Sequence, residues 1–233
     1  FQPGIWYVMP VTRADHMQFV GGIANKSIVQ THLFYLNLMD DIYSTYRAVQ
    51  PGETPFPFTD VPESRWSYPY IKELYDAGVI SGMTATTFAP AENMTRAQFV
   101  TMLAELQGAD VSAYRTGKFT DVPADAWYAP YVSWAAENGV VHGVSDTAFA
   151  PDADISRQDM AVMVYRYAER FGIRLGTDVP PITFADAGDI AAYALPAVQA
   201  LQRAGVISGM PDGSFRPREH MTREQACVVL CAL

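Results

Sequence analysis

Three arginines occupy the same position of a repeated sequence and have the chemistry to bind an anion. Arg96, Arg157 and Arg223 each follow a Thr or Ser and open an apolar stretch with helical spacing. A guanidinium presents a planar fork of donors that fits a carboxylate or a phosphate. In the first turn of a helix it also lies beside backbone N–H groups that lack partners within the helix. The pattern therefore predicts three anion sites.

An arginine at this position does not favour the helix itself. The helix dipole already makes the N-terminus positive, so a cation there costs roughly 0.3–1 kcal/mol. Two structural alternatives stay open. The arginine either covers apolar surface from solvent or pairs with an acidic residue of its own repeat, Asp60, Asp121 or Asp186. On the functional interpretation, changing these arginines to alanine reduces binding without unfolding the domain.

Aromatic residues and glycines recur at fixed distances before each arginine. The ring stands thirty residues earlier, at Trp66, Trp127 and Tyr193, and a glycine fourteen residues earlier, at Gly82, Gly143 and Gly209. Flat rings stack on the apolar face of a sugar, and core packing is the equal alternative. The glycines serve either a turn with positive φ or the close approach of a ligand to the backbone, and neither role tolerates a side chain.

These positions belong to a unit that occurs three times, and each unit predicts two helices joined by a loop. The first helix ends at a glycine that can adopt the left-handed cap, namely Gly78, Gly139 or Gly205. The second helix begins at a capping box or a close variant, in which the third-position side chain reaches back to the backbone. The three boxes are Thr95-x-x-Gln98, Ser156-x-x-Asp159 and Thr222-x-x-Gln225.

The repeats are expected at residues 58–104, 119–170 and 184–233. Residues 1–57 differ, and an apolar face from Ile28 to Val49 predicts a helix of about 20 residues. The segment from Thr12 to Val20 is either a truncated fourth repeat or an ordinary capped helix. Because the chain begins with Phe1, we expect a fragment or a processed form, which leaves room for an upstream signal peptide.

Composition excludes several classes of function. The formal charge of −9 over 233 residues argues against a nucleic-acid partner and also opposes any anionic ligand, which must then rely on locally placed arginines. No apolar run approaches the roughly 20 residues of a membrane span. Cys227 and Cys231 are expected to be buried free thiols, and neither a metal site nor a cofactor is predicted. No catalytic motif is present, and His16, His32, His142 and His220 form no constellation, so we expect no enzyme in these residues.

The repeated residues resemble the S-layer homology domain, which bacterial surface proteins commonly carry in three copies. The matching text is Phe58-Thr-Asp60-Val-Pro, Trp66, Gly78-Val-Ile-Ser-Gly82, Phe88-Ala-Pro90 and Met94-Thr-Arg96-Ala-Gln98, with Gly209-Met-Pro-Asp-Gly213-Ser-Phe215 in the third copy. The resemblance covers about three-quarters of the chain. It implies an all-α, pseudo-threefold, three-pronged bundle, with the segment 1–57 added at its N-terminus.

The resemblance also implies a function. Members of the family bind an acidic, pyruvylated secondary cell-wall polysaccharide in grooves between the prongs, which places this chain outside the cell, at the cell wall. By resemblance the three arginines contact that ligand, and we add the three aromatic residues, the aspartates, the glycines and Gln98 as candidate contacts. Each copy departs from the family's Thr-Arg-Ala-Glu motif, so the grooves are not expected to be equivalent. Arg96 and Arg157, backed by Trp66 and Trp127, are the stronger candidates.

Two other functions stay open. The repeats and the helix around residues 27–49 could assemble with copies of the chain or with other surface proteins. The third alternative is a fragment of a cell-surface hydrolase.

Overall fold

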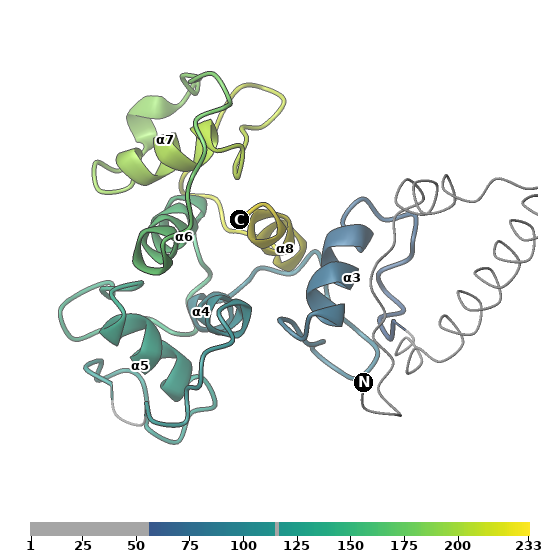
Figure 1. Cartoon of the computed structure of the whole chain (residues 1–233), viewed down its shortest axis with the longest axis vertical. Helices are drawn as coiled ribbons and strands as arrows, with labels where there is room; N and C mark the ends of the chain where they lie inside the picture. The colour runs from purple at the N-terminus through teal and green to yellow at the C-terminus, as the bar shows by residue number, and fades with distance from the viewer. Residues whose placement is uncertain (1–55, 115–116) are drawn as a thin grey trace, which may run out of the picture. The chain divides into compact units, whose positions relative to one another are not determined.

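The computed structural model describes residues 56–114 and 117–233, and the predicted N-terminal helix and fourth repeat lie outside them. The described part is all-α, as predicted, and contains no β-strand. Three short outer helices alternate with three inner helices along the chain (Figure 1). The outer helices are α3 (Tyr68–Asp76), α5 (Ala129–Glu137) and α7 (Leu195–Arg203), and the inner helices are α4 (Arg96–Leu106), α6 (Arg157–Phe171) and α8 (Arg223–Cys231).

Local sequence explains where the outer helices begin and end. Each has a proline in its first turn, where the missing N–H costs nothing. Each is followed two residues later by Gly78, Gly139 or Gly205, all with φ of 74°. This is the left-handed cap that the glycines predicted. The apolar pair after each glycine is buried in the core, as at Val79 and Ile80.

The inner helices begin at the predicted caps, with one correction. Thr95 and Gln98 form a complete capping box, and so do Thr222 and Gln225. Ser156 accepts a hydrogen bond from the backbone N–H of Asp159, but the Asp159 side chain does not reach back. The prediction of a reciprocal bond at Asp159 is therefore wrong. An aspartate is one methylene shorter than a glutamate or glutamine, and this carboxylate turns elsewhere.

Each outer helix packs on the inner helix of the preceding repeat. The packed pairs are α5 on α4, α7 on α6 and, joining the third repeat to the first, α3 on α8 (Figure 1). The buried apolar side chains of all three repeats form one cluster, which includes Phe88, Phe149 and Phe215. Neighbouring repeats therefore complete each other's core.

Backbone hydrogen bonds connect the three repeats in a closed cycle. The N–H of Ile155 donates to the carbonyl of Met94 at 2.9 Å, Met221 donates to Ile155 at 3.0 Å, and Met94 donates to Met221 at 2.9 Å. These residues directly precede the caps of the inner helices. The cycle thus fixes the starts of α4, α6 and α8, where the candidate arginines stand.

Candidate functional site

The three arginines join neighbouring repeats. Arg96, Arg157 and Arg223 are only 5%, 8% and 6% exposed. The Nε of each donates to the carbonyl of a phenylalanine in the next repeat around the cycle, at 2.9 Å for Phe149, 2.7 Å for Phe215 and 2.8 Å for Phe88. Each guanidinium also lies over the ring of that phenylalanine, 4.4–5.0 Å from its centroid. The three side chains therefore have a structural role, but it differs from the two that the sequence left open, because each joins its own repeat to the next one.

The backbone amides beside the arginines are already paired. The N–H of Arg96 donates to the carbonyl of Ala153 at 2.9 Å and that of Ala97 to Pro151 at 3.0 Å, while Gln98 donates to the Thr95 hydroxyl. The first two bonds recur at the other inner helices. The prediction of an anion site built from unpaired helix-terminal amides is wrong, because the adjacent repeat supplies their acceptors. Any anion must approach the guanidinium from its other edge.

The aspartates hold the backbone around the same phenylalanines. The Asp60 carboxylate accepts from the N–H groups of Phe88 and Ala89 at 2.9 and 2.7 Å, and Asp121 and Asp186 make the same pair of bonds in their repeats. The second donor residue has positive φ in every repeat, 57–58° at Ala89, Ala150 and Arg216. A carboxylate that accepts two N–H bonds can hold this disfavoured conformation. No ion pair joins an arginine to the aspartate of its own repeat in the described residues, and ligand contact by these aspartates stays a prediction.

The glycines at 82, 143 and 209 are required by packing. A Cβ on Gly82 would overlap the carbonyl oxygens of Thr84 and Thr87 and would lie 2.5 Å from the Phe58 ring. A Cβ on Gly143 would lie 2.6 Å from the Phe119 ring, and one on Gly209 would lie 2.9 Å from the Phe184 ring. Positive φ occurs only at Gly143, so a turn explains one glycine of the three. Each glycine lines a groove, but its contacts already account for the absence of a side chain.

Three grooves are each lined by residues of all three repeats, and each is numbered after the repeat that supplies most of its lining. Groove 1 is lined mainly by the first repeat and also by Arg223 and Trp127. Groove 2 is lined mainly by the second repeat and also by Arg96 and Tyr193, and groove 3 mainly by the third repeat and also by Arg157 and Trp66. The predicted pairing of arginine and ring within one repeat is therefore wrong. The ring of each groove comes from the following repeat and the arginine from the preceding one.

The three grooves differ in volume, and each has an exposed aromatic ring in its lining. Their volumes are about 390, 410 and 220 Å³ for grooves 1, 2 and 3. Trp66, Trp127 and Tyr193 are 57%, 60% and 59% exposed, which rules out the alternative that they pack in the core. Beside each groove glycine stands a further apolar side chain, Met83, Val144 or Met210, which sequence reasoning missed although it recurs directly after the glycine.

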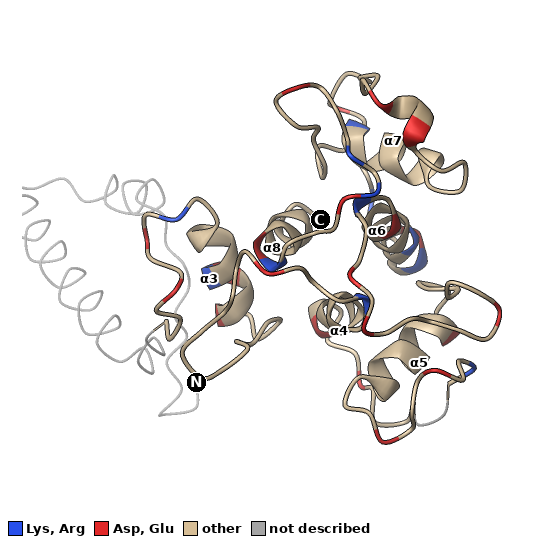
Figure 2. Ribbon diagram, turned by 180° about the vertical axis from the view of Figure 1, so that it is seen from behind, with Lys and Arg blue, Asp and Glu red and all other residues tan. Residues whose placement is uncertain are grey.

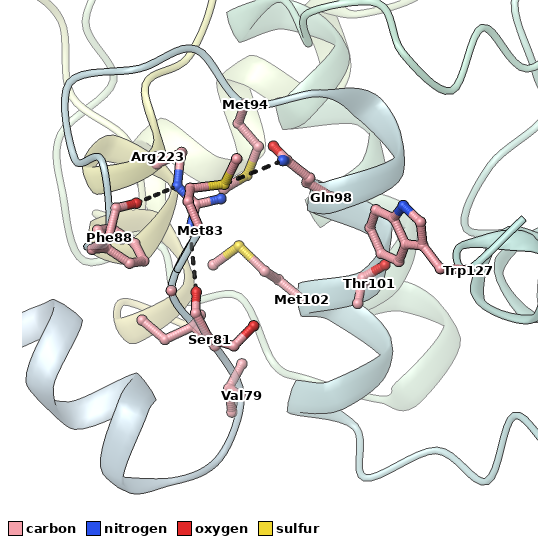
Figure 3. Close-up of a pocket in the computed structure, with 12 residues that line it drawn as sticks. Val79, Ser81, Met83, Phe88, Met94, Gln98, Thr101, Met102, Trp127 and Arg223 are labelled. Atoms are coloured by element: carbon pink, nitrogen blue, oxygen red, sulfur yellow. Dashed lines mark hydrogen bonds between the residues drawn. The ribbon is translucent and has the colours of Figure 1, made fainter. Parts of the chain in front are cut away.

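Groove 1 illustrates how these parts face one another (Figure 3). Arg223 spans from the Phe88 carbonyl to the carbonyl of Ser81, at 2.8 and 3.3 Å. Gln98 lines the groove, and its amide donates to the Met83 sulfur at 3.8 Å. Trp127 stands on the far side of Met102 from Arg223. An apolar face and a cation thus line the same groove from two sides.

Each inner helix begins with an arginine, although the chain is acidic overall. Figure 2 shows blue at the starts of α4, α6 and α8, and red both in the outer loops and beside the inner helices. Burial lowers the pKa of Arg96, Arg157 and Arg223, but a guanidinium keeps its charge at neutral pH. Arg223 and Arg157 therefore give grooves 1 and 3 a fixed, desolvated cation, whereas Arg96 in groove 2 lies 3.6 Å from the Asp159 carboxylate.

Other predicted features lie outside the grooves or only partly fit. Cys227 is buried and free, and burial raises its pKa to about 12, whereas Cys231 is only half-buried. His142 lines groove 2, and His220 lies 3.5 Å from Asp154 on the surface. Among residues 56–114 and 117–233, no cluster of metal-ligating side chains occurs. Within the same residues every helix is too short or too polar to cross a membrane.

Comparison with known proteins agrees with this arrangement. The S-layer homology domain family matches residues 57–100, 118–161 and 183–227. An endoglucanase of Bacillus sp. (strain KSM-635) is 37% identical over 76% of this chain and 19% of its own length. A cellulosome-anchoring protein of Acetivibrio thermocellus is 29% identical over 76% of this chain and 38% of its own. An S-layer protein of Bacillus thuringiensis subsp. finitimus is 24% identical over 72% and 20%.

The chain thus spans less than two-fifths of these relatives. The matched segments contain the arginines, the aromatic residues, the aspartates and the glycines of all three grooves. On the evidence of three tandem matches that together cover more than half of its residues, the chain belongs to the S-layer homology domain family.

Proposed function

We propose that this chain anchors the protein that carries it to the bacterial cell surface, by binding an acidic, pyruvylated secondary cell-wall polysaccharide in the three grooves. The observation that carries the proposal is the shared composition of the grooves. Each brings an exposed aromatic ring, a buried arginine and an apolar wall together from three repeats. A ring binds the flat face of a sugar, and the arginine attracts its carboxylate.

The similar proteins support the anchoring part of this proposal. One is named as a cellulosome-anchoring protein and others as S-layer proteins, while relatives with hydrolase names match over less than a fifth of their length. A module shared by proteins of such different names fits a common task of attachment. Catalysis then belongs to other domains, and this chain is a non-enzymatic binding module of an extracellular protein.

The weak binding expected from a single groove also fits attachment to a polymer. A charge-assisted hydrogen bond contributes roughly 1.5–3 kcal/mol, and a single groove offers few of them. Three grooves on one rigid body can engage neighbouring polymer chains, which raises the overall affinity without new contacts.

The exposed rings allow a test that leaves the fold intact. We expect Trp66→Ala, Trp127→Ala and Tyr193→Ala each to weaken binding to purified acidic wall polysaccharide roughly 2- to 10-fold, and the triple variant to abolish it. Ile182 and Leu195 are exposed apolar residues outside the three grooves, so their alanine variants are matched controls. Sedimentation with the polysaccharide measures binding, and full binding by the triple variant would refute the proposal.

A further inference from the structure

Groove 2 differs from the other two in the residue at the fourth position of the motif that begins with Thr-Arg or Ser-Arg. In grooves 1 and 3 this residue is Gln98 or Gln225, whose side-chain oxygen accepts from the N–H of the capping threonine at 3.1 or 3.2 Å. In groove 2 it is Asp159, which makes no such bond. Its Oδ1 accepts from the Tyr193 hydroxyl at 2.7 Å, and its Oδ2 lies 3.6 Å from Arg96 Nη1.

Asp159 therefore occupies the position that an incoming anion would take on Arg96. Arg157 and Arg223 each extend Nη2 to a serine carbonyl, Ser208 at 3.4 Å and Ser81 at 3.3 Å. Arg96 instead directs Nη1 to the carboxylate of Asp159, which also accepts a hydrogen bond from the Tyr193 hydroxyl of the third repeat. A ligand carboxylate here would meet a neutralised guanidinium and a like charge, and both lower its affinity.

The same groove contains a second cation that no motif predicted. Arg166 stands seven residues after Asp159 on α6, hence two turns along the same helix face, and it lines groove 2. Its side chain is half-buried and forms no hydrogen bond or ion pair within the described residues; burial lowers its pKa, and the nearby charge of Glu169 partly offsets this. His142, on the opposite loop of the groove, is close enough that partial desolvation and the charge of Arg166 lower its pKa, with Lys118 contributing.

Neither of the other grooves has this pair. The positions equivalent to Arg166 are Glu105 and Ala232, and Glu105 is engaged with the Tyr131 hydroxyl at 2.8 Å. The positions equivalent to His142 are Ser81 and Ser208. Two nitrogen-bearing side chains thus converge on the one groove in which the motif arginine is already paired.

We propose that groove 2 holds the acidic group of its ligand with Arg166 and His142, and not with Arg96. This rests on the proposed function, because it assumes that the grooves bind an acidic glycan. Tyr193 then stacks on the sugar while its hydroxyl keeps Asp159 on Arg96. The chain then has two kinds of groove. Grooves 1 and 3 bind the ligand's carboxylate beside the motif arginine, and groove 2 binds it at Arg166.

The test isolates groove 2 and changes one charge. Trp66→Ala with Trp127→Ala removes the rings of grooves 3 and 1. In that background we expect Arg166→Gln to weaken binding of a pyruvyl-ketal hexose methyl glycoside roughly 10- to 100-fold by calorimetry. Arg170→Gln makes the same charge change one turn further along α6, outside the groove, and is the matched control. The methyl ester of the same sugar, which has no charge, should bind the Arg166→Gln variant and its parent equally.

A second variant tests the role assigned to Asp159. Asp159→Asn removes the competing carboxylate, so affinity for the acid should rise severalfold, and a fall would overturn the proposal. Equal affinities of the Arg166→Gln and Arg170→Gln variants for the acidic sugar would also overturn the proposal. So would binding of this sugar by the intact chain but not by the variant that carries Trp66→Ala and Trp127→Ala. In those cases the proposed function stands. If the intact chain binds neither the acidic sugar nor the wall polysaccharide, the proposed function itself fails.

Discussion

Phe88 and Arg223 lie 135 residues apart and are joined by a hydrogen bond of 2.8 Å from the arginine Nε to the phenylalanine carbonyl. The N–H of the same Phe88 donates to Asp60, in its own repeat. One peptide segment is therefore held by two repeats at once, and the guanidinium lies 4.4 Å from the ring centroid. The arginine that faces groove 1 also closes the structure between the first and third repeats.

Because of this double role, removing the arginine should cost stability. We expect Arg223→Ala to lower the free energy of unfolding by about 2–4 kcal/mol, since it leaves the buried Phe88 carbonyl without its donor. Arg223→Lys should not restore it, because an ammonium lacks the planar fork. Urea denaturation measures the loss, with the exposed Arg218→Ala as control. A change below about 0.5 kcal/mol would show that the arginine serves ligand alone.

The junction of the first and third repeats has an additional ion pair. Arg65 donates to both oxygens of buried Glu224 at 2.7 and 2.9 Å, and the Ser67 hydroxyl donates at 2.6 Å. Arg65→Ala should destabilise the domain by about 1–3 kcal/mol, because it leaves a buried carboxylate underpaired. Arg216→Ala breaks two solvent-exposed pairs, which contribute little to stability, so its loss should be clearly smaller. Equal losses of unfolding free energy in Arg65→Ala and Arg216→Ala would show that the pair of Arg65 and Glu224 does not stabilise the junction.

Acid should weaken the loops around the phenylalanines. Burial raises the pKa of Asp121 and Asp186, but their backbone N–H donors outweigh it and hold both pKa values below the ordinary range. A carboxyl group with a depressed folded pKa stabilises the protein above its unfolded pKa of about 4 and loses this effect as the pH falls. Urea midpoints should therefore drop from pH 5 to pH 3. The drop should be smaller in Asp121→Asn, and an unchanged pH dependence there would count against the prediction. The exposed Asp125→Asn is the control.

The groove glycines should be intolerant of even one methyl group. Gly82→Ala places a Cβ against two carbonyl oxygens and the Phe58 ring, so we expect a loss of about 2 kcal/mol or more. Gly188 has open space within 4 Å and no positive φ, so Gly188→Ala should be neutral or slightly stabilising. Thermal unfolding compares the two directly. Equal melting temperatures would mean that the loop beside groove 1 adjusts freely.

Features with a local cause could be predicted from the sequence. The six α-helices between residues 56 and 233 of the described chain follow from apolar spacing, and their ends follow from Gly78 and its equivalents and from the capping threonines and serine. The repeat alignment placed every candidate residue in the correct register, and exposure of the three rings agrees with a binding role. Among the helix caps the pattern failed at Asp159, where one missing methylene redirects a side chain from its own cap to another repeat.

Relations between repeats could not be predicted. The alignment gives three copies of one position but does not say which copy lies beside which, so Trp127 was associated with Arg157 although it lies in the groove of Arg223. The paired amides of Arg96 and Ala97 depend on carbonyls more than fifty residues away. The positive φ of Ala89, Ala150 and Arg216 has no sequence signature, so the task of the aspartates stayed hidden.

The account depends most on the claim that the grooves recognise an acidic group on a wall glycan. The direct measurement is sedimentation of the chain with purified secondary wall polysaccharide, before and after chemical removal of the pyruvyl groups. We predict that the intact polysaccharide retains the chain, that the depyruvylated polymer does not, and that the triple variant of Trp66, Trp127 and Tyr193 binds neither. Undiminished binding to the depyruvylated polymer would contradict the account.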